Sequence, residues 1–395
     1  MLPAATRCAA FGVLTLLAAA CSHAVDGAAP APEPMPAEKR LPPPSPPPPP
    51  ARTAPTRPVV FTPLPSTRIG GIDYISVADV AQRLGLKLAW VEPEKKLTLT
   101  DAANRVALDA DSRDTSINGL RVFLGDPARV RGGVIFLSRI DVERCLLPLV
   151  RPGLGVTLPP APKLIVIDPG HGGKDDGTEN KTLGLKEKSL TLDVALRLRT
   201  LLEAAGYKIV MTRTDDRELA SKKEVDLALR ADVANREHAD LFVSIHFNSA
   251  TKDTRGTEVF SLAPRTQRST DSWSTHENDS APDDLPGNRF DHWNAVLTAA
   301  IHRELLQALK TEDRGKKIAH WAVLRTIECP GVLVEPAIIS NEGEARRVAT
   351  VAFRQQIAEA LAAGIRDYAT TLDSLRPKPQ PAPATAATPP TSSSR

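Results

Sequence analysis

Short apolar runs recur from residue 163 onward, and each is bounded by Gly, Pro or polar residues. Such runs predict buried strands, and here they alternate with longer segments of helical periodicity. The alternation predicts an α/β fold in which helices cover both faces of a mainly parallel sheet, a three-layer α/β/α arrangement. We expect strands at 164–168, 208–212, 241–248, 257–262, 322–325 and 332–335, and helices at 187–205, 225–237, 293–309 and 342–368.

A different pattern precedes this region. Short runs that alternate apolar and polar residues predict half-buried strands at 87–91, 96–100, 105–108 and 121–124. One helix is expected at 77–84, with Ser76 as its N-cap and Gly85 as its stop, and Asn118-Gly119 favours a hairpin. These elements predict a small α+β accessory domain at 68–155, followed by the α/β domain at 160–372.

The 36 prolines of the 395-residue chain are unevenly distributed. Residues 22–67 are rich in Ala and Pro, with a dense run at 42–50 that favours extended polyproline II. At roughly 3.1 Å per residue, this linker could reach about 140 Å. Residues 373–395 are rich in Pro, Ala, Ser and Thr and are expected to form a disordered tail.

The amino terminus has the features of an export signal. Arg7 is followed by an apolar stretch at 9–20 and then Cys21, and this stretch is too short to span a bilayer. Residues 17–21 resemble a bacterial lipobox, in which cleavage occurs before the cysteine and the new terminus is acylated. Ordinary cleavage after small residues is the alternative. We expect an exported, periplasmic protein, tethered through a lipid anchor to the outer membrane.

Charge and cysteine content limit the expected partners and the kind of metal site that the chain could form. The net charge of +3 is small and the charges are interspersed, so nucleic acid is not an expected partner. After export only Cys21, Cys145 and Cys329 would remain, which is no disulfide framework. Without any Cys-x-x-Cys pair, a metal site would have to be built from His and carboxylate groups.

Two histidines follow predicted strands. His171 comes after the apolar run at 164–168 and His246 closes the run at 241–245, so both should reach the carboxyl edge of the sheet. Glu187 lies at the opening turn of the next predicted helix, and a strand-turn-helix excursion can bring it to His171. Two imidazoles and one carboxylate suit a catalytic Zn²⁺ site with a position left for water.

A second carboxylate, Glu335, ends the predicted strand at 332–335 and could act as a general base. The residues alone leave open which of Glu187 and Glu335 is ligand and which is base. Asp168 is either a turn-former before Pro169 or a partner for the other nitrogen of a ligand histidine. Arg230 and Asn248 either tie loops together or hold substrate carboxylate and amide groups.

A series of motifs occurs in order along the α/β domain: Asp168-Pro169-Gly170-His171-Gly172-Gly173, Glu187-Lys188, Thr212-Arg213 followed by Asp215 or Asp216, Arg230 with Ala234-Asn235, 239–248, Arg314-Gly315 and Val332-Leu333-Val334-Glu335. With these motifs the domain resembles the zinc-dependent N-acetylmuramoyl-L-alanine amidases over about residues 163–368. By that resemblance His171, Glu187 and His246 are zinc ligands, Glu335 is the catalytic carboxylate, and Arg314 is a candidate substrate or supporting residue. The implied reaction cleaves the amide between N-acetylmuramic acid and L-alanine of the peptidoglycan stem.

Two local features modify this expectation. The family usually has Gly and an aromatic residue shortly after the catalytic Glu, whereas this chain has Pro336-Ala337-Ile338, which should alter the substrate groove. The polar loop at 265–288 carries acidic residues, and we hypothesise that it partly occludes the site. Some family members are blocked in this way by a carboxylate of their own.

The accessory domain resembles the module named after the amino-terminal domain of copper amine oxidases, which implies a binding or spacing role and no copper. Peptidoglycan is the expected partner, and a protein activator is a candidate. Two alternatives to the amidase remain open. One is a non-catalytic peptidoglycan-binding lipoprotein on an amidase fold, and the other is a zinc peptidase that cuts within the stem peptide.

Overall fold

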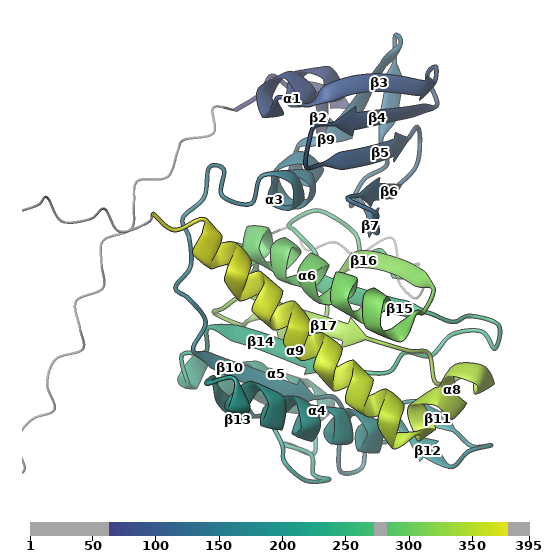
Figure 1. The fold of residues 1–395 in the computed structure, drawn as a ribbon, viewed down its shortest axis with the longest axis vertical. Coiled ribbons are helices and arrows are strands. Elements are labelled where there is room, and N and C mark those ends of the chain that lie inside the picture. Colours follow the sequence, from purple (N-terminus) through teal and green to yellow (C-terminus); the bar gives the residue numbers. More distant parts are fainter. Residues whose placement is uncertain (1–62, 272–282, 378–395) are drawn as a thin grey trace, which may run out of the picture. The chain divides into compact units, whose positions relative to one another are not determined.

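The computed structural model describes residues 63–271 and 283–377 (Figure 1). The expected export signal, nearly all of the Pro-rich linker and most of the expected tail lie outside the described residues, as does the centre of the acidic loop.

The α/β domain is built on a twisted, mainly parallel sheet with the strand order β13-β10-β14-β17-β15-β16. Neighbouring strands are parallel except β15 and β17, which are antiparallel. The strands are β10 (Leu164–Pro169), β13 (Lys208–Met211), β14 (Leu241–Ile245), β15 (Thr257–Leu262), β16 (Asp313–Ala319) and β17 (Gly331–Glu335). A separate two-stranded ribbon is formed by β11 (Glu179–Asn180) and β12 (Leu185–Lys186).

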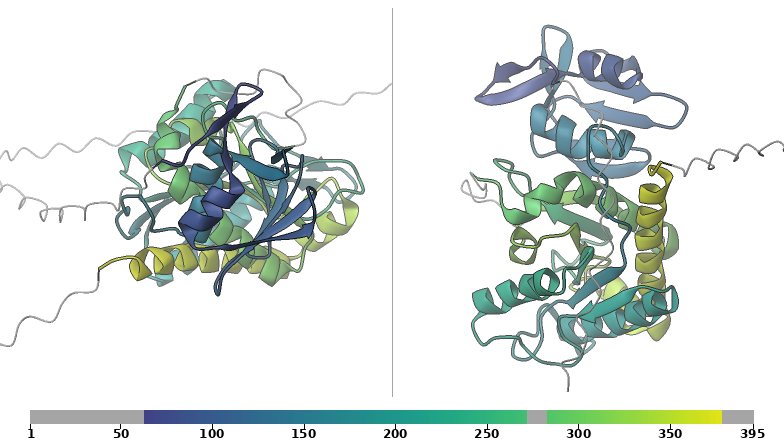
Figure 2. Two further views of the ribbon diagram at one scale, coloured as in Figure 1. Left: turned by 90° about the horizontal axis from the view of Figure 1, so that it is seen from above. Right: turned by 90° about the vertical axis from the view of Figure 1, so that its left-hand side faces the viewer.

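Helices cover both faces of this sheet. One apolar cluster combines Ile165, Ile167 and Val243 with α4, α6 and α9, while alternate strand residues such as Val166 and Phe242 pack with α5 and α7. Figure 2 shows the sheet between these helix layers. The fold prediction, a three-layer α/β/α domain, is therefore confirmed. The helices are α4 (Glu187–Ala204), α5 (Lys223–Arg236), η2 (Pro286–Phe290), α6 (Asp291–Leu309), α7 (Ala322–Arg325), α8 (Glu342–Ala349) and α9 (Val351–Ser374).

The accessory domain has its own apolar core and the expected α+β composition. Ser76 caps α1 by accepting a hydrogen bond from the Ala78 N–H, and Gly85 ends it with φ 68°. Asn118 and Gly119 both have positive φ at the β6–β7 turn. Its elements are β1 (Thr67–Ile69), β2 (Ile72–Ser76), α1 (Val77–Leu84), β3 (Lys87–Glu92), β4 (Lys96–Thr100), β5 (Arg105–Asp109), β6 (Asp114–Ile117), β7 (Leu120–Phe123), β8 (Arg129–Arg131), β9 (Val134–Ser138), α2 (Arg139–Asp141), η1 (Val142–Leu146) and α3 (Leu147–Val150).

Strands β3 to β7 of the accessory domain are joined edge to edge to the sheet of the α/β domain. Strand β7 pairs in parallel with β16 through Val122 and Lys316, so that β3 to β7 continue the sheet of the α/β domain. Ala299 of α6 also belongs to the apolar core of the accessory domain. The accessory domain is therefore packed against the α/β domain through both backbone pairing and apolar contacts.

Two secondary-structure predictions are wrong in detail, and one strand was not predicted. Residues 322–325 form helix α7 and not a strand, and the strand of this region, β16, lies earlier in the chain. The Asp313–Ala319 segment contains four charged residues and therefore lacks the apolar run by which the other strands are recognised. The expected helix at 342–368 is two helices, because Thr350 leaves the helical conformation with ψ 137° and caps α9.

Two absences apply to residues 63–271 and 283–377. No helix there combines the length and apolar character needed to cross a bilayer. Cys145 and Cys329, the cysteines of this part of the chain, are both buried free thiols.

Candidate metal centre

Parallel strands bring the two histidines together. In the β10–β14 pair, Pro169 lies opposite Ile245, so the residues that follow these strands emerge at the same edge of the sheet. The rings of His171 and His246 meet edge to face with their centroids 4.9 Å apart. Both side chains are largely buried, with 16% and 18% of their surface exposed.

Glu187 completes the cluster from the first residue of α4. Its Oε1 atom lies 3.0 Å from Nε2 of His171 and 3.0 Å from Nδ1 of His246. Metal–ligand distances of about 2.0–2.1 Å place tetrahedral ligand atoms roughly 3.3 Å apart, so these spacings suit one zinc ion. One ligand atom from each of the three residues lies within 4.8 Å of the others.

The other Glu187 oxygen accepts a hydrogen bond from the Thr178 N–H at 2.7 Å, which fixes the carboxylate. Burial alone would raise the pKa of Glu187, but the hydrogen bonds and charges of His171 and His246 hold it below its ordinary value. The carboxylate is thus kept ionised and aimed between the two rings, as a metal ligand requires.

Close packing of the backbone makes room for the rings. A Cβ atom on Gly170 would lie 2.3 Å from the His246 ring, so only glycine is compatible with this approach. His171 itself has φ 62°, an uncommon left-handed conformation for a residue with a side chain. Strain of this kind persists only where the surroundings hold it, and it is concentrated at functional sites.

A buried ion-pair network holds the strained backbone. Arg230 of α5 donates to the His171 carbonyl oxygen at 2.8 Å and to Asp168 and Asp226 at 2.9 and 2.6 Å. Asp168 also accepts from Thr212 and Ser244. Burial would raise the pKa of Asp168, but the charge of Arg230 holds it below its usual value. These contacts agree with the interpretation in which Arg230 ties loops together. Asp168 contacts Arg230 and the hydroxyl groups of Thr212 and Ser244.

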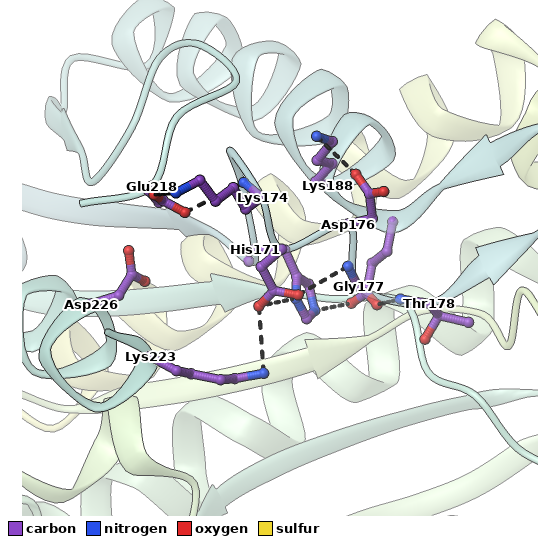
Figure 3. Close-up of polar contacts among 12 residues, drawn as sticks. His171, Lys174, Asp176, Gly177, Thr178, Lys188, Glu218, Lys223 and Asp226 are labelled. Atoms are coloured by element: carbon purple, nitrogen blue, oxygen red, sulfur yellow. Dashed lines mark hydrogen bonds and ion pairs between the residues drawn. The ribbon is translucent and has the colours of Figure 1, made fainter. Parts of the chain in front are cut away.

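A second basic cluster supports the same turn from the side of α4. Lys188 donates to the Gly173 carbonyl oxygen at 2.6 Å and pairs with Asp176 at 2.8 Å (Figure 3). The buried guanidinium of Arg213 donates to the carbonyl oxygens of Pro169 and Gly170. Burial, with the nearby charge of Arg230, lowers the pKa of Arg213 to about 10.

Asp175 contacts the second nitrogen of His171. Its Oδ2 atom lies 3.0 Å from His171 Nδ1 and 3.4 Å from Lys223 Nζ. Figure 3 shows Lys223 extending toward His171 from α5. Nδ1 makes no hydrogen bond among the described residues, so the Asp175 contact is one of charge, while Nε2 faces Glu187. A negative charge beside Nδ1 favours a proton on that nitrogen, which would leave Nε2 free as a metal-ligand atom.

Glu335 ends β17, the neighbour of β14, and is 6% exposed. With His171, Glu187 and His246 it lines a cavity of about 860 Å³. Its Oε2 atom is buried and has no hydrogen-bond partner among the described residues. Burial and the neighbouring charges of Glu187 and Glu258 raise the pKa of Glu335 well above its ordinary value, and Lys317 opposes this shift. Strongly perturbed pKa values are concentrated at functional sites, which makes Glu335 a candidate acid–base group.

The remaining two candidate residues, Asn248 and Arg314, both contact Glu258, which the sequence analysis did not identify. Asn248 and Arg314 both donate to the buried carboxylate of Glu258, Arg314 through Nε at 3.2 Å. Asn248 also lines the cavity. The residues that follow Glu335 are not among those that line the cavity. Ala337, Ile338 and Ile339 are fully buried, and the Asn248 N–H donates to the Ala337 carbonyl oxygen.

Sequence reasoning missed Asp175, Glu258 and Lys317. Asp175 lies in the same turn as His171, and its spacing of four residues was an available signal. Glu258 lies in a strand that was predicted, but nothing local distinguishes it from an exposed glutamate. Lys317 lies in the strand that was missed.

Comparison with known proteins agrees with this geometry. Residues 165–367, just over half of the chain, match the family model described as N-acetylmuramoyl-L-alanine amidase, and the chain belongs to this family. Residues 56–145 match the model described as the copper amine oxidase N-terminal domain.

Among curated proteins, the chain is 34% identical over 227 residues to the N-acetylmuramoyl-L-alanine amidase AmiC of Escherichia coli O6:H1, with 52% of this chain and 53% of AmiC covered. It is 31% identical to AmiA of Escherichia coli K12, with 52% and 76% covered. The chain thus spans about half the length of that AmiC. The solved N-acetylmuramoyl-L-alanine amidase AmiC2 of Nostoc punctiforme is 31% identical, with 52% of this chain and 96% of that chain covered and a TM-score of 0.42.

Proposed function

We propose that this chain is a zinc-dependent N-acetylmuramoyl-L-alanine amidase that cleaves the amide between N-acetylmuramic acid and the L-alanine of the peptidoglycan stem. One observation carries the proposal: His171, Glu187 and His246 converge to within 4.8 Å, and the buried Glu335 lines the same cavity. Membership of the amidase family supports the choice of bond.

The donor set fits zinc, with Nε2 of His171, Nδ1 of His246 and Oε1 of Glu187 as the holding atoms. Bound zinc would supply a water that ionises near neutral pH and a Lewis acid for the scissile carbonyl. Glu335 would take the proton of the attacking water at its unpartnered Oε2 and return it to the departing amine. The charge of Asp175 would favour a proton on Nδ1 of His171, and Arg230 would hold the strained His171 backbone.

We further propose that the protein works outside the cytoplasmic membrane, in the periplasm, tethered to the outer membrane by a lipid on Cys21. The lipobox-like 17–21 segment and the Pro-rich linker support this placement. Partial occlusion of the site by the loop at 265–288 and the need for a protein activator stay predictions. The central part of that loop, 272–282, lies outside the described residues.

Digestion of purified peptidoglycan tests the activity. The chain from residue 22 onward would be incubated with sacculi in zinc buffer, with and without a chelator, and the soluble products analysed by mass spectrometry. We expect free stem peptides that begin with L-alanine, and their disappearance with chelator. Shortened stems would instead indicate a peptidase. Binding to sacculi without any release would indicate the non-catalytic alternative.

A further inference from the structure

A buried charge cluster lies behind the proposed catalytic carboxylate and outside the metal centre. In the antiparallel β15–β17 pair, Glu258 lies directly opposite Glu335, so the two side chains are neighbours on one face of the sheet. Glu258 is 1% exposed. Its carboxylate accepts from Lys317 Nζ at 2.5 Å, from Arg314 and from Asn248, so that it is fixed by three donors.

Lys317 is covered by an aromatic residue of the accessory domain. Its Nζ lies 5.5 Å from the ring centre of Phe123, in β7, and 5.7 Å from that of Phe260, in β15. A Cβ atom on Gly315, which has φ 101°, would lie 2.7 Å from the Phe123 ring. Glycine at this position of β16 is therefore what allows Phe123 to approach the strand.

Strand β7 is held in this position by Asp313. The Arg121 N–H donates to Asp313 Oδ2 at 2.9 Å, while Oδ1 accepts from the Gly315 N–H at 2.8 Å and lies 2.7 Å from Nε2 of the buried His302. One carboxylate thus links β7, β16 and α6. Together with the backbone pairing of Val122 and Lys316, it places Phe123 in a defined position over Lys317.

We propose that Glu258 and Lys317 are positioning residues for Glu335, and that Phe123 makes the accessory domain a part of the active-site structure by enclosing this pair. The proposal rests on the catalytic role proposed for Glu335. It assigns to the accessory domain a function in turnover itself, beyond any role in binding or spacing.

The physical basis is the cost of buried charge. Glu258 is tolerated beside Glu335 only because Lys317 and Arg314 compensate its charge, and buried pairs depend on being enclosed and well aligned. Phe123 and Phe260 exclude water from Lys317 and contribute cation–π attraction. Without Phe123, water would reach Lys317 and weaken its bond to Glu258. The wall against which Glu335 is packed would then become mobile, and small displacements of a catalytic group are costly to the rate.

The test compares Phe123→Ala with Trp90→Ala in the chain from residue 22 onward. Trp90 is the matched control, because it is also a partly buried aromatic residue of the accessory domain but lies in β3, at the far end of the sheet order. Kinetics would be measured on a soluble muramoyl-peptide, with zinc content and thermal unfolding recorded for each variant. We expect Phe123→Ala to lower kcat about tenfold with unchanged KM and zinc content, and Trp90→Ala to keep the wild-type kcat.

Two further variants separate positioning from folding. Phe123→Leu retains apolar cover and should recover most of the lost kcat. The double variant Glu258→Gln/Lys317→Met removes both buried charges and leaves Arg314, whose side chain is 20% exposed, within reach of solvent, so the variant should fold. It should nevertheless lose kcat without losing zinc. Wild-type kcat in both Phe123→Ala and the double variant would overturn the proposal, as would equal losses in Phe123→Ala and Trp90→Ala.

Failure of the underlying function gives a different result. If the unmodified chain with zinc releases no stem peptides that begin with L-alanine, the amidase proposal itself fails. If the unmodified chain is active and the Phe123 and Glu258/Lys317 variants match it, only the positioning role is lost.

Discussion

Strands β14 and β16 are both buried, but for different reasons. All five residues of β14 are buried, and its apolar side chains pack on both faces of the sheet. Strand β16 buries Lys316 and Lys317 to 1% and 4% exposure, and Lys317 is compensated by Glu258 from another strand. Burial of β14 follows from its own composition, whereas burial of β16 requires partners supplied by the rest of the fold.

The two strands also serve different parts of the site. Strand β14 leads into His246, whose environment is set by the local turn and by Glu187. Strand β16 carries Lys317, which pairs with Glu258 opposite the proposed catalytic carboxylate Glu335 and is covered by Phe123 of the accessory domain. The candidate metal centre is thus built from residues near apolar strands, while the proposed support of Glu335 is built from charges that depend on tertiary structure.

The largest expected effects concern the two parts of the site that the strands serve, at Glu335 and the candidate ligand His171. Glu335→Gln keeps the size of the side chain but cannot accept the proton, so kcat should fall about 10²- to 10⁴-fold while zinc stays bound. His171→Ala should lose both the activity and the metal, since it removes a ligand. Peptide release from peptidoglycan and zinc content after gel filtration measure the two effects.

Glu328→Gln is the matched control, because Glu328 is an exposed glutamate in a loose surface ion pair with Arg289, at 3.4 Å. It should retain full activity. Full activity in Glu335→Gln would instead move the acid–base role to another residue of the cavity.

The next largest effect concerns the buried charge pair of Lys317 in β16 and Glu258. Lys317→Met alone removes one partner of a buried pair, and such changes typically cost about 3–5 kcal/mol of folding free energy. Arg314 still compensates part of the Glu258 charge, so the lower end of that range is expected. The double variant Glu258→Gln/Lys317→Met should recover part of the loss, because both buried charges are removed, although Arg314, 20% exposed, loses its carboxylate partner. Urea unfolding of the wild type and both variants measures this difference.

If the double variant is as unstable as Lys317→Met, the cost comes from lost packing and not from unpaired charge. The contrast between β14 and β16 would then be one of composition only. A double variant that is stable but slow in turnover would separate the contribution of the pair to folding from its contribution to Glu335.

The same contrast explains what could be predicted from the sequence. The α/β layers, the accessory domain and the convergence of His171, Glu187 and His246 follow from apolar runs, caps and strand ends, which are local signals. Strand β16 was missed because Asp313–Ala319 is mostly charged, and charged segments are read as exposed. Its partners lie tens of residues away: Glu258 for Lys317, and the Arg121 N–H for Asp313.

The roles of Asn248 and Arg314 were left open for a related reason. Their side chains suit a substrate, but both donate to Glu258, which no local pattern distinguishes. The role of Arg230 was also left open. Its contacts to Asp168, Asp226 and His171 could be identified only from the folded structure, which brings their segments together. Residue type indicates the chemistry that is available, whereas the partner is decided by tertiary structure.

The smallest expected effect concerns Asp291, near the other face of β16. Asp291 begins α6 and is 6% exposed. Burial raises the pKa of its carboxyl to about 7. The hydrogen bond donated by the Asn288 side chain and the charges of Arg144 and Lys316 oppose this rise. A carboxyl whose pKa is higher in the folded state favours folding at low pH. That contribution is present below about pH 4 and is lost as the pH rises through about 7.

Asp291→Asn stays neutral throughout, so its stability relative to the wild type should increase from pH 5 to pH 8 and then level off. Urea unfolding of metal-free protein at several pH values measures this, with the exposed Asp283→Asn as a control that retains every other titrating group. A constant difference between Asp291→Asn and the wild type across that range would mean that Asp291 is ionised in the folded protein. In that case Lys316 and Arg144 would compensate Asp291 as fully as Lys317 and Arg314 compensate Glu258, and both faces of β16 would be organised by paired charge.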